Sequence, residues 1–201
     1  AVLKAIKKYF PSPVKDNVIY HGVNQKTEEA YVAEYDSSKP VSAYIFKTIV
    51  DPFVGKFSLV KVCDGVLKKD SVLYNAEKGE EEKVGKLYIL KGKDNVEVDM
   101  LNAGDIGAIA KLAVSQTRDT LSTKDCPIIY EKTPVPTPYT FMSYVTKKKG
   151  EEDKASSAIK RLMEEDLTLK EVNDKENKQI LLYGLGDQHL DVVVSKLKER
   201  Y

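Results

Sequence analysis

Residues 41–63 read VSAYIFKTIVDPFVGKFSLVKVC, and the prediction of a β-rich fold starts from this stretch. Its two halves, 41–50 and 55–63, are rich in the β-branched and aromatic residues that favour strands. An Asp-Pro pair and a glycine lie between them, which predicts a hairpin turn. The apolar residues of the second half change phase after Leu59, and this slip is compatible with a β-bulge.

Further short β-type runs continue to residue 132. They read SVLYN, EKVGKLYIL, NVEVDML and GDIGAIAKLA, and Lys-Gly or Ala-Gly pairs separate them. No helical periodicity lies among them. Several short strands at such intervals predict a small closed β-barrel over residues 41–132.

The stretch 133–138, TPVPTP, marks the end of this barrel pattern and predicts a stiff, extended proline connector. After it the periodicities change. YTFMSYVT predicts a strand, residues 155–163 have helical spacing, LTLKEV and KQILLY predict a hairpin, and residues 190–197 predict a last helix. Residues 139–201 therefore have the order β-α-β-β-α, which is a ferredoxin-like split βαβ unit without its last strand. The predicted fold class is multi-domain, β followed by α+β.

The missing strand of this unit would pair with the first, so residues 139–145 are expected to form a bare sheet edge. This edge is apolar on both faces, with Tyr139, Phe141 and Val145 on one and Met142 and Tyr144 on the other. Unprotected edges pair with other strands. We therefore expect the unit either to be less stable than the barrel or to self-associate through this edge.

The N-terminal region has a different character. Residues 1–10, AVLKAIKKYF, predict an amphipathic helix that Pro11-Ser12-Pro13 ends, and its apolar stripe must pack on another element. The chain begins without methionine inside this helical pattern, which suggests an excised fragment. Residues 14–40 are polar without strong periodicity and are interpreted as a linker or a surface-hugging extension.

Composition limits the function classes. The 201 residues are 42% hydrophobic and 31% charged with a net charge of +1, which argues against indiscriminate nucleic-acid binding but leaves room for a local basic patch. Cys63 and Cys126 form no CxxC motif and are interpreted as buried thiols in a reducing compartment, in keeping with a cytoplasmic protein. No apolar run is long enough to span a membrane, and no signal-peptide pattern opens the chain.

The stretch GLGDQH, with Gly184, Gly186 and His189, resembles the start of a dinucleotide-binding fingerprint. That fingerprint needs a third glycine where His189 stands, and an acidic residue about twenty positions further on. A tight strand-to-helix turn explains the motif better. Asp187 then lies at a helix N-terminus, and His189 packs or hydrogen-bonds in the first turn. We predict a structural role for Gly184, Gly186 and His189.

Catalytic patterns are also missing. DPFVGK lacks the first glycine of a phosphate loop, and Phe57 stands where a magnesium-binding hydroxyl would be needed. There is no Gly-x-Ser-x-Gly, and the two histidines have no metal-ligand spacing. The sequence therefore predicts that this chain has no catalytic site, cofactor site or metal site of its own.

Several stretches resemble the elongation factor G family of translational GTPases. AYIFKTIVDPFVGKFSLVKVCDGVLKKDSVLYN is similar to the start of domain II, with Gly65, Leu67, Tyr74 and Asn75 at matching positions. LNAGDIGAIAKL and TRDTLS are similar to the end of that domain. RLMEEDLTL and YGLGDQHLDVVVSKLKERY resemble domain III, and KKYFPSP resembles the last helix of the GTPase domain. The matches follow the family's order over nearly the whole chain.

The resemblance implies a fragment with the terminal helix of a missing GTPase domain at 1–13, domain II, and most of domain III. It implies a translation-factor-type barrel and a ribosomal partner, in ribosomal RNA and small-subunit protein. In the family, domain II braces the factor on small-subunit RNA, and domain III relays between the GTPase switches and the tip domains during translocation. GTP and magnesium belong to the GTPase domain of the parent protein. Candidate contacts to the ribosome are Lys56, Lys91, Lys93, Lys147, Lys148 and Lys149; for the last three, a solvated loop is the alternative.

Some positions depart from the family pattern. Residues 90–95, LKGKDN, replace the family's His-Ala-Asn and Arg-Glu-Glu, and Arg118 stands in place of the glycine of Thr-Gly-Asp-Thr-Leu. Asp187-Gln188 replaces Glu-Leu before the histidine. These differences suggest a divergent paralogue. A ribosomal-protection GTPase is one alternative, and a stand-alone RNA- or protein-binding module is another.

Overall fold

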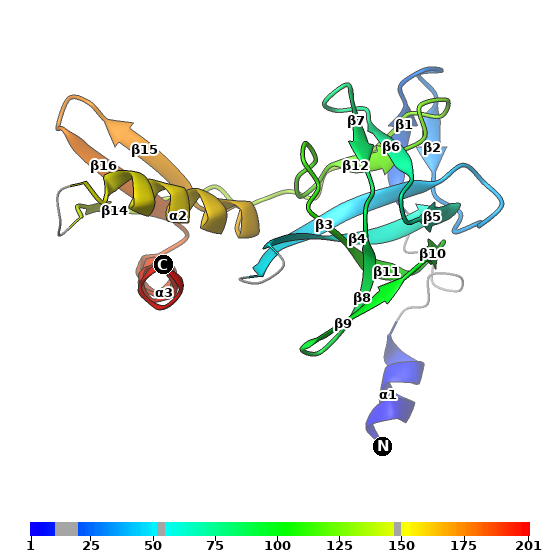
Figure 1. Cartoon of the computed structure of the whole chain (residues 1–201), viewed down its shortest axis with the longest axis horizontal. Coiled ribbons are helices and arrows are strands. Elements are labelled where there is room, and N and C mark those ends of the chain that lie inside the picture. Colours follow the sequence, from blue (N-terminus) through cyan, green and yellow to red (C-terminus); the bar gives the residue numbers. More distant parts are fainter. Residues whose placement is uncertain (11–19, 52–54, 147–149) are drawn as a thin grey trace. The chain divides into compact units, whose positions relative to one another are not determined.

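The computed structural model describes residues 1–10, 20–51, 55–146 and 150–201 (Figure 1). Three predicted features fall on residues that are not described. They are Pro11-Ser12-Pro13, which was predicted to end the first helix, the turn after Asp51, and the tri-lysine at 147–149. The chain divides into two compact units, one comprising residues 1–47 and 51–132 and the other residues 48–50 and 133–201. In the part of the chain described here, no helix is long and apolar enough to cross a membrane.

The first unit is built on an eight-stranded sheet with the neighbour order β7-β6-β12-β3-β4-β11-β8-β9 (Figure 1). A second pair, β5 (Val66–Lys68) and β10 (Met100–Asn102), is antiparallel. The strands of the large sheet are β3 (Ser42–Asp51), β4 (Gly55–Asp64), β6 (Val72–Asn75), β7 (Glu80–Lys83), β8 (Leu87–Lys91), β9 (Asp94–Val98), β11 (Ile106–Ala110) and β12 (Thr120–Ser122).

The core of this unit consists of aliphatic side chains that the strands direct inward. Twelve of them are buried together, and they come from strands spread over the whole unit. They are Ala43, Ile45, Val60, Val62, Leu67, Leu73, Val84, Leu87, Leu101, Ile109, Leu112 and Leu121. Burying this much aliphatic surface is the main source of stability for such a sheet. The predicted β-barrel class is confirmed.

The predicted bulge in β4 is wrong on the side that pairs with β11. The ladder runs one-to-one from Phe57 opposite Ala110 to Lys61 opposite Ile106. Apolar residues change phase because both faces of β4 are covered. Val60 faces the core, whereas Phe57 lies on the other face and is buried by an edge-to-face contact with Tyr88.

The interpretation of residues 14–40 as a linker is wrong for the described part from residue 20 onward. This part contains β1 (His21–Asn24) and β2 (Ala30–Val32), and β1 pairs with both β2 and β13 (Ile128–Tyr130) in a three-stranded sheet. A second buried cluster packs this small sheet on the outer face of β3 and β4. Its members are Ala33, Tyr44, Cys63, Ile128 and Tyr130, with Tyr20, Tyr31 and Cys126 partly buried beside them.

A buried carboxylate ties this segment to the barrel. Asp64, at the end of β4, accepts the Tyr31 hydroxyl at 2.8 Å and the backbone N–H groups of Glu34 at 3.2 Å and Asp36 at 3.0 Å. Asp64 is fully buried. Next to it, burial raises the pKa of the free Cys63 thiol to about 12. The segment is therefore an integral part of the first unit.

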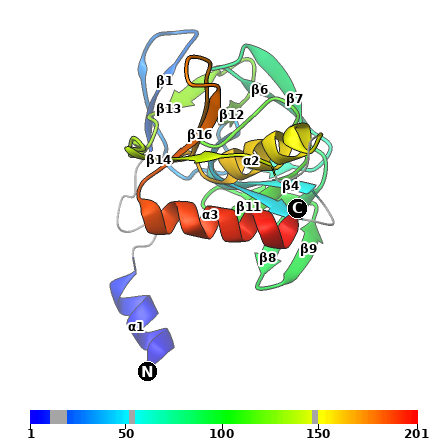
Figure 2. The same cartoon turned by 90° about the vertical axis from the view of Figure 1, so that its left-hand side faces the viewer.

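The second unit has the predicted order β-α-β-β-α. Its sheet has the order β14-β16-β15, and both pairings are antiparallel. Helices α2 and α3 lie alongside each other (Figure 2). They contribute Ile159, Leu162, Leu190 and Val193 to a core that also includes Leu182 of β16. The elements are β14 (Thr140–Tyr144), α2 (Glu152–Glu165), β15 (Lys170–Asp174), β16 (Gln179–Gly184) and α3 (Asp187–Arg200). This is the predicted split βαβ arrangement.

Among the described residues β14 pairs only with β16, so it lies at an edge of its sheet. Met142 and Tyr144 pack against the core of the unit, whereas Phe141 is exposed on the opposite face, where it contacts Tyr183 at 5.2 Å between ring centroids. The two predicted faces of this strand are therefore both apolar. Self-association through this edge stays a prediction.

The N-terminal helix α1 (Val2–Tyr9) has its apolar residues exposed. None of its residues is buried in the described structure. The surface that its apolar stripe was predicted to contact is therefore not defined.

We expect Asp64→Asn to destabilise the first unit by about 1–3 kcal/mol, because the neutral amide has a single acceptor oxygen. If this oxygen keeps the N–H groups of Glu34 and Asp36, an NH2 group replaces the oxygen that accepts the Tyr31 hydroxyl. Urea unfolding gives the magnitude, and amide hydrogen exchange over residues 30–36 should accelerate more than in the rest of the barrel. Asp99→Asn is the matched control, since this exposed carboxylate forms only a surface ion pair with Lys69. Equal effects of the two substitutions would contradict the anchoring role of Asp64.

Candidate functional site

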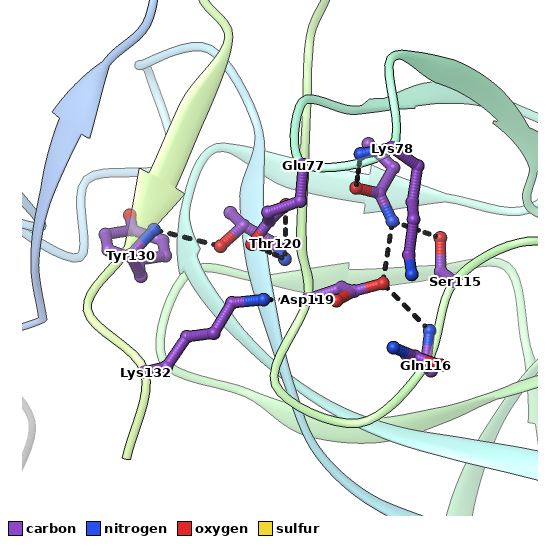
Figure 3. A network of polar contacts seen from close by, with 9 residues as sticks. Glu77, Lys78, Ser115, Gln116, Asp119, Thr120, Tyr130 and Lys132 are labelled. Atoms are coloured by element: carbon purple, nitrogen blue, oxygen red, sulfur yellow. Dashed lines mark hydrogen bonds and ion pairs between the residues drawn. The ribbon is translucent and has the colours of Figure 1, made fainter. Parts of the chain in front are cut away.

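A buried hydrogen-bonded network joins the end of β6 to the loop between β11 and β12 (Figure 3). Asn75 donates from Nδ2 to Ser115 Oγ and to Asp119 Oδ2, both at 3.0 Å. The same Asp119 oxygen accepts the backbone N–H of Gln116 at 3.1 Å, and Asn75 Oδ1 accepts that of Lys78 at 3.1 Å. Both central side chains are buried. The network fixes the loop relative to the turn that follows β6.

The other side of the network reaches the end of the first unit. Lys132 Nζ lies 3.7 Å from Asp119 Oδ1, an oxygen that has no hydrogen-bond partner among the described residues. Glu77 accepts the backbone N–H of Thr120 at 3.2 Å, and Thr120 Oγ1 accepts that of Tyr130 at 2.9 Å (Figure 3). Burial raises the pKa of Glu77, although its backbone hydrogen bonds act in the opposite direction. These contacts hold β12, β13 and residue 132 together.

Arg118 lies in the same loop with a backbone φ of +79°. This left-handed region favours glycine, because a Cβ there is crowded by the backbone. The Arg118 N–H donates to the Ile45 carbonyl at 2.7 Å, and its buried Nε has no hydrogen-bond partner in the described structure. The departure noted in the sequence, arginine in place of glycine, therefore falls at a strained position.

A second buried carboxylate holds the first half of this loop. Glu82 of β7 accepts three consecutive backbone N–H groups, from Ala113 at 2.8 Å, Val114 at 2.9 Å and Ser115 at 2.7 Å. Its side chain is almost completely buried. Burial alone would raise the pKa of Glu82, but the three backbone hydrogen bonds outweigh it and lower the pKa. The carboxylate is therefore charged at neutral pH and clamps residues 113–115.

Beside this clamp, an open groove of about 740 Å³ lies between β7, the start of β8 and residues 110–113. Its lining includes Lys83, Lys86, Tyr88 and Lys111. The three lysines are exposed, and Tyr88 is partly exposed. The groove can therefore present positive charge next to an aromatic ring.

The structure separates the lysines that were predicted to contact the ribosome. Lys56 Nζ donates to the Ser115 carbonyl at 3.3 Å, and the Lys56 carbonyl accepts the Lys111 N–H at 2.8 Å, which places Lys56 beside the groove. Lys91 and Lys93 flank Gly92 in the exposed hairpin between β8 and β9. If the register of β4, β11 and β8 is continued by two residues, Lys56 lies level with Gly85, which precedes β8 and is six residues before Lys91, so the two lysines are ~20 Å apart. Lys147–Lys149 lie outside the described residues, and an RNA contact stays a prediction for all six.

The groove lysines were missed because no short motif contains them. Lys83, Lys86 and Lys111 are spread over nearly thirty residues of sequence, and each lies inside one of the β-type runs, EKVGKLYIL or GDIGAIAKLA. Only the antiparallel pairing of β8 with β11 brings Tyr88 opposite Ala108 and so places residues 83–88 beside residues 110–113. Only the pairing of β8 with β11 indicates that these lysines lie close together.

The stretch around His189, for which the sequence predicted a structural role, is a hydrogen-bonded turn. His189 Nδ1 accepts the Leu185 N–H at 3.1 Å, so Nε2 carries the proton and donates to Asp166 Oδ2 at 2.9 Å. Burial would raise the pKa of Asp166, but hydrogen bonds from Thr168 and His189 lower it. The imidazole thus links the end of α2 to the start of α3.

The two glycines of this turn have different roles. A Cβ at Gly184 would lie 2.8 Å from Leu190 Cδ2 and 3.0 Å from His189 Nδ1, so the close approach of α3 to β16 requires glycine there. Gly186 is the N-cap residue of α3 with an extended φ of 170°, and a Cβ added there would come no closer than 3.9 Å to its nearest neighbour, the Tyr139 hydroxyl. β16 is antiparallel to both neighbours, which differs from the parallel βαβ unit of a dinucleotide site.

Within the described ranges, no group of three or more His, Cys, Asp or Glu side chains could hold a metal ion.

Comparisons with known proteins bear on the whole chain. The family model of "Elongation factor G domain 2" matches residues 40–124, and that of "Elongation Factor G, domain III" matches residues 135–201. Elongation factor G of Karelsulcia muelleri (strain GWSS) is 34% identical over 200 residues, which cover 100% of this chain and 29% of that protein. A crystal structure of a Thermus thermophilus protein matches with a TM-score of 0.74 at 24% identity, over 99% of this chain and 27% of that one.

Fold and comparisons together define a protein class, in which a translation-factor-type β-barrel precedes a ferredoxin-like split βαβ unit. Within this class the chain belongs to the elongation factor G family, its residues 40–124 to domain 2 and its residues 135–201 to domain III. It spans less than a third of the length of the relatives it matches.

We expect Gly184→Ala to destabilise the second unit by about 1–3 kcal/mol, because the added methyl group overpacks against the buried Leu190 and the hydrogen-bonded His189. Gly186→Ala is the matched control and should change stability by at most about 0.5 kcal/mol. Thermal unfolding of the two variants tests the difference. Similar melting temperatures for both would show that α3 can shift away from β16 at little cost.

We expect Arg118→Gly to stabilise the first unit by about 0.5–1 kcal/mol. Relief of ~1–2 kcal/mol of left-handed strain is partly offset by the greater freedom of glycine in the unfolded chain. Arg118→Ala keeps the strained backbone and separates the effect of the guanidinium from that of φ. Denaturant unfolding of the three proteins is the measurement, and a glycine variant no more stable than the alanine variant would disprove the strain.

Proposed function

We propose that this chain is the non-catalytic middle region of a ribosome-associated translational GTPase of the elongation factor G type. The observation that carries the proposal is the match of two family domains in their family order, together with 34% identity to an elongation factor G along the whole chain. The parent protein is then a cytoplasmic GTPase. GTP and magnesium would be bound by its GTPase domain and not by the residues of this chain.

In this role the barrel braces the factor on the small ribosomal subunit. Its loops suit a bracing function because buried carboxylates hold them in one conformation, as Glu82 holds residues 113–115. A rigid surface loses little conformational entropy when it binds. Ribosomal RNA and small-subunit protein are the proposed partners.

The second unit would couple the GTP state of the parent to a translocation-type movement. Between Tyr130, where β13 ends, and Thr140, where β14 begins, the chain carries three prolines at alternate positions. A proline-rich connector of this kind is semi-rigid and transmits displacement better than a flexible linker does. Coupling between the two units is therefore assigned to this segment.

Sedimentation of the purified chain with isolated ribosomal subunits tests the proposal. We expect the chain to sediment with small subunits in preference to large ones and to be released by salt, since contacts to phosphate are screened. Excess chain should also slow translocation driven by an intact elongation factor G, through competition for the same surface. Calorimetry should detect no binding of GTP to this chain.

The outcomes separate the candidate functions. Sedimentation with neither subunit, or with the large subunit alone, would overturn the bracing role. Release of a ribosome-bound antibiotic without any effect on translocation would instead support the ribosomal-protection alternative.

A further inference from the structure

We propose that the groove beside Glu82 binds a single strand of RNA, with Lys83, Lys86 and Lys111 on its phosphates and Tyr88 against a base. The inference rests on the proposed ribosomal role and assigns the contact to residues that no sequence motif indicated. Four features of the first unit support it, namely the position of the groove, its rigidity, its charge and its aromatic ring.

The groove lies on the outer face of the barrel. Leu87 and Ile89 of β8 point to or pack against the core, so Tyr88 between them faces outward. Tyr88 is opposite Ala108 of β11 in the ladder, and residues 110–113 continue from that strand along the side of the groove. The lining therefore comes from residues 81–88 and from residues 110–113, and the two segments meet where the Ala110 N–H donates to the Lys86 carbonyl at 3.3 Å.

Both sides are held in place before any ligand binds. Glu82 lies on one side and accepts the N–H groups of residues 113–115 on the other, so its carboxylate bridges the groove. Lys111 adopts a left-handed φ of +58° and its N–H donates to the Lys56 carbonyl at 2.8 Å. A site held this firmly does not need to be ordered on binding.

Three lysines and two glutamates line the groove, so its lining carries a net charge of +1 (3 − 2). Of its two acidic residues, Glu82 is used by backbone N–H groups, and Glu81 pairs with Lys124 at 2.8 Å. Lys86 forms an ion pair with Glu97, with 2.8 Å between Nζ and Oε2. Lys83 and Lys111 form no ion pair within the described part of the chain, so their ammonium groups are available for phosphate.

The ring of Tyr88 distinguishes an RNA strand from other anions. It packs edge-to-face on the buried Phe57, with ring centroids 5.3 Å apart and an interplanar angle of 85°, and this contact fixes its orientation. Partly exposed aromatic rings on the outer face of a barrel, next to lysines, are the usual platform on which unpaired bases stack. An acidic peptide would use the lysines but would not need the ring.

The test uses the whole chain and a short fluorescein-labelled oligouridine, with binding followed by fluorescence anisotropy at low salt. The double substitution Lys83→Glu with Lys111→Glu should weaken binding at least tenfold, and the slope of log affinity against log salt should become shallower by about 0.7 for each lost phosphate contact. The matched control is Lys26→Glu with Lys160→Glu, the same charge change at exposed lysines outside the groove, which should bind nearly as the unmodified chain does.

Tyr88 supplies the second arm. Tyr88→Leu should weaken oligouridine binding by about fivefold to a hundredfold, the range measured when a stacking aromatic is removed, whereas Tyr88→Phe should retain most of the affinity. Circular dichroism and thermal unfolding establish that each variant is folded. If the lysine double variant fails to fold, Lys83→Glu alone takes its place.

Two results would overturn the inference. One is oligouridine binding that the lysine and Tyr88 variants leave unchanged. The other is binding of polyglutamate that the lysine variant abolishes and Tyr88→Leu leaves intact, which identifies an acidic protein as the ligand.

The experiment also separates this inference from the proposed function. Sedimentation with small subunits that none of the groove variants affects would leave the ribosomal role standing and remove the groove from it. If the chain binds oligouridine through the groove but does not sediment with small subunits, RNA binding by the groove is supported and the ribosomal role is overturned.

Discussion

The hydrogen bonds that Glu82 accepts from residues 113–115 hold the loop between β11 and β12 in place, and the shape of the neighbouring surface follows from that loop. The carboxylate comes from a short strand, β7, and accepts three successive N–H groups of a loop that has no secondary structure of its own. Buried backbone donors without partners are costly, so a loop that lies against the barrel needs an acceptor of this kind. With residues 113–115 fixed, Asn75 and Asp119 can fix the next part of the loop, and both the groove and the connection to β12 acquire a defined shape.

The same solution recurs elsewhere in the chain. Asp64 accepts two backbone N–H groups and a tyrosine hydroxyl, and these hydrogen bonds anchor residues 31–36 to the end of β4. In the second unit, Asp166 receives Thr168 and His189 and joins the end of one helix to the start of the next. Hydrogen bonds to the charged form lower the pKa of Glu82 and Asp166. Glu82 and Asp166 therefore add stability that is present at neutral pH and lost as the pH falls through their folded pKa values.

Rigid loops are what a bracing surface requires, and this connects the architecture with the proposed role. The groove combines a fixed aromatic ring, two lysines, Lys83 and Lys111, that form no ion pair among the described residues, and a bridging carboxylate that forms no ion pair with them. The strained Arg118 lies in the same loop, two residues beyond Gln116, where the family pattern has glycine. The divergence from the family pattern that this arginine suggested in the sequence stays a prediction.

Elements whose apolar residues follow one period could be predicted from the sequence. The β-α-β-β-α order of residues 139–201 and most barrel strands are of this kind, because a single buried face imposes its period on the residues. The Gly-x-Gly turn was recognised too, though not that Gly184 is required for packing and Gly186 is not. Tertiary structure alone decided three other features. β1 and β2 form because β1 pairs with β13 and the second buried cluster packs on β3 and β4. The apolar residues of β4 change phase without a bulge on the side of β11, because both faces of the strand are covered. The groove lysines lie together because β8 pairs with β11. In each case the deciding contacts join residues far apart in the chain, and such contacts cannot be predicted from local periodicity.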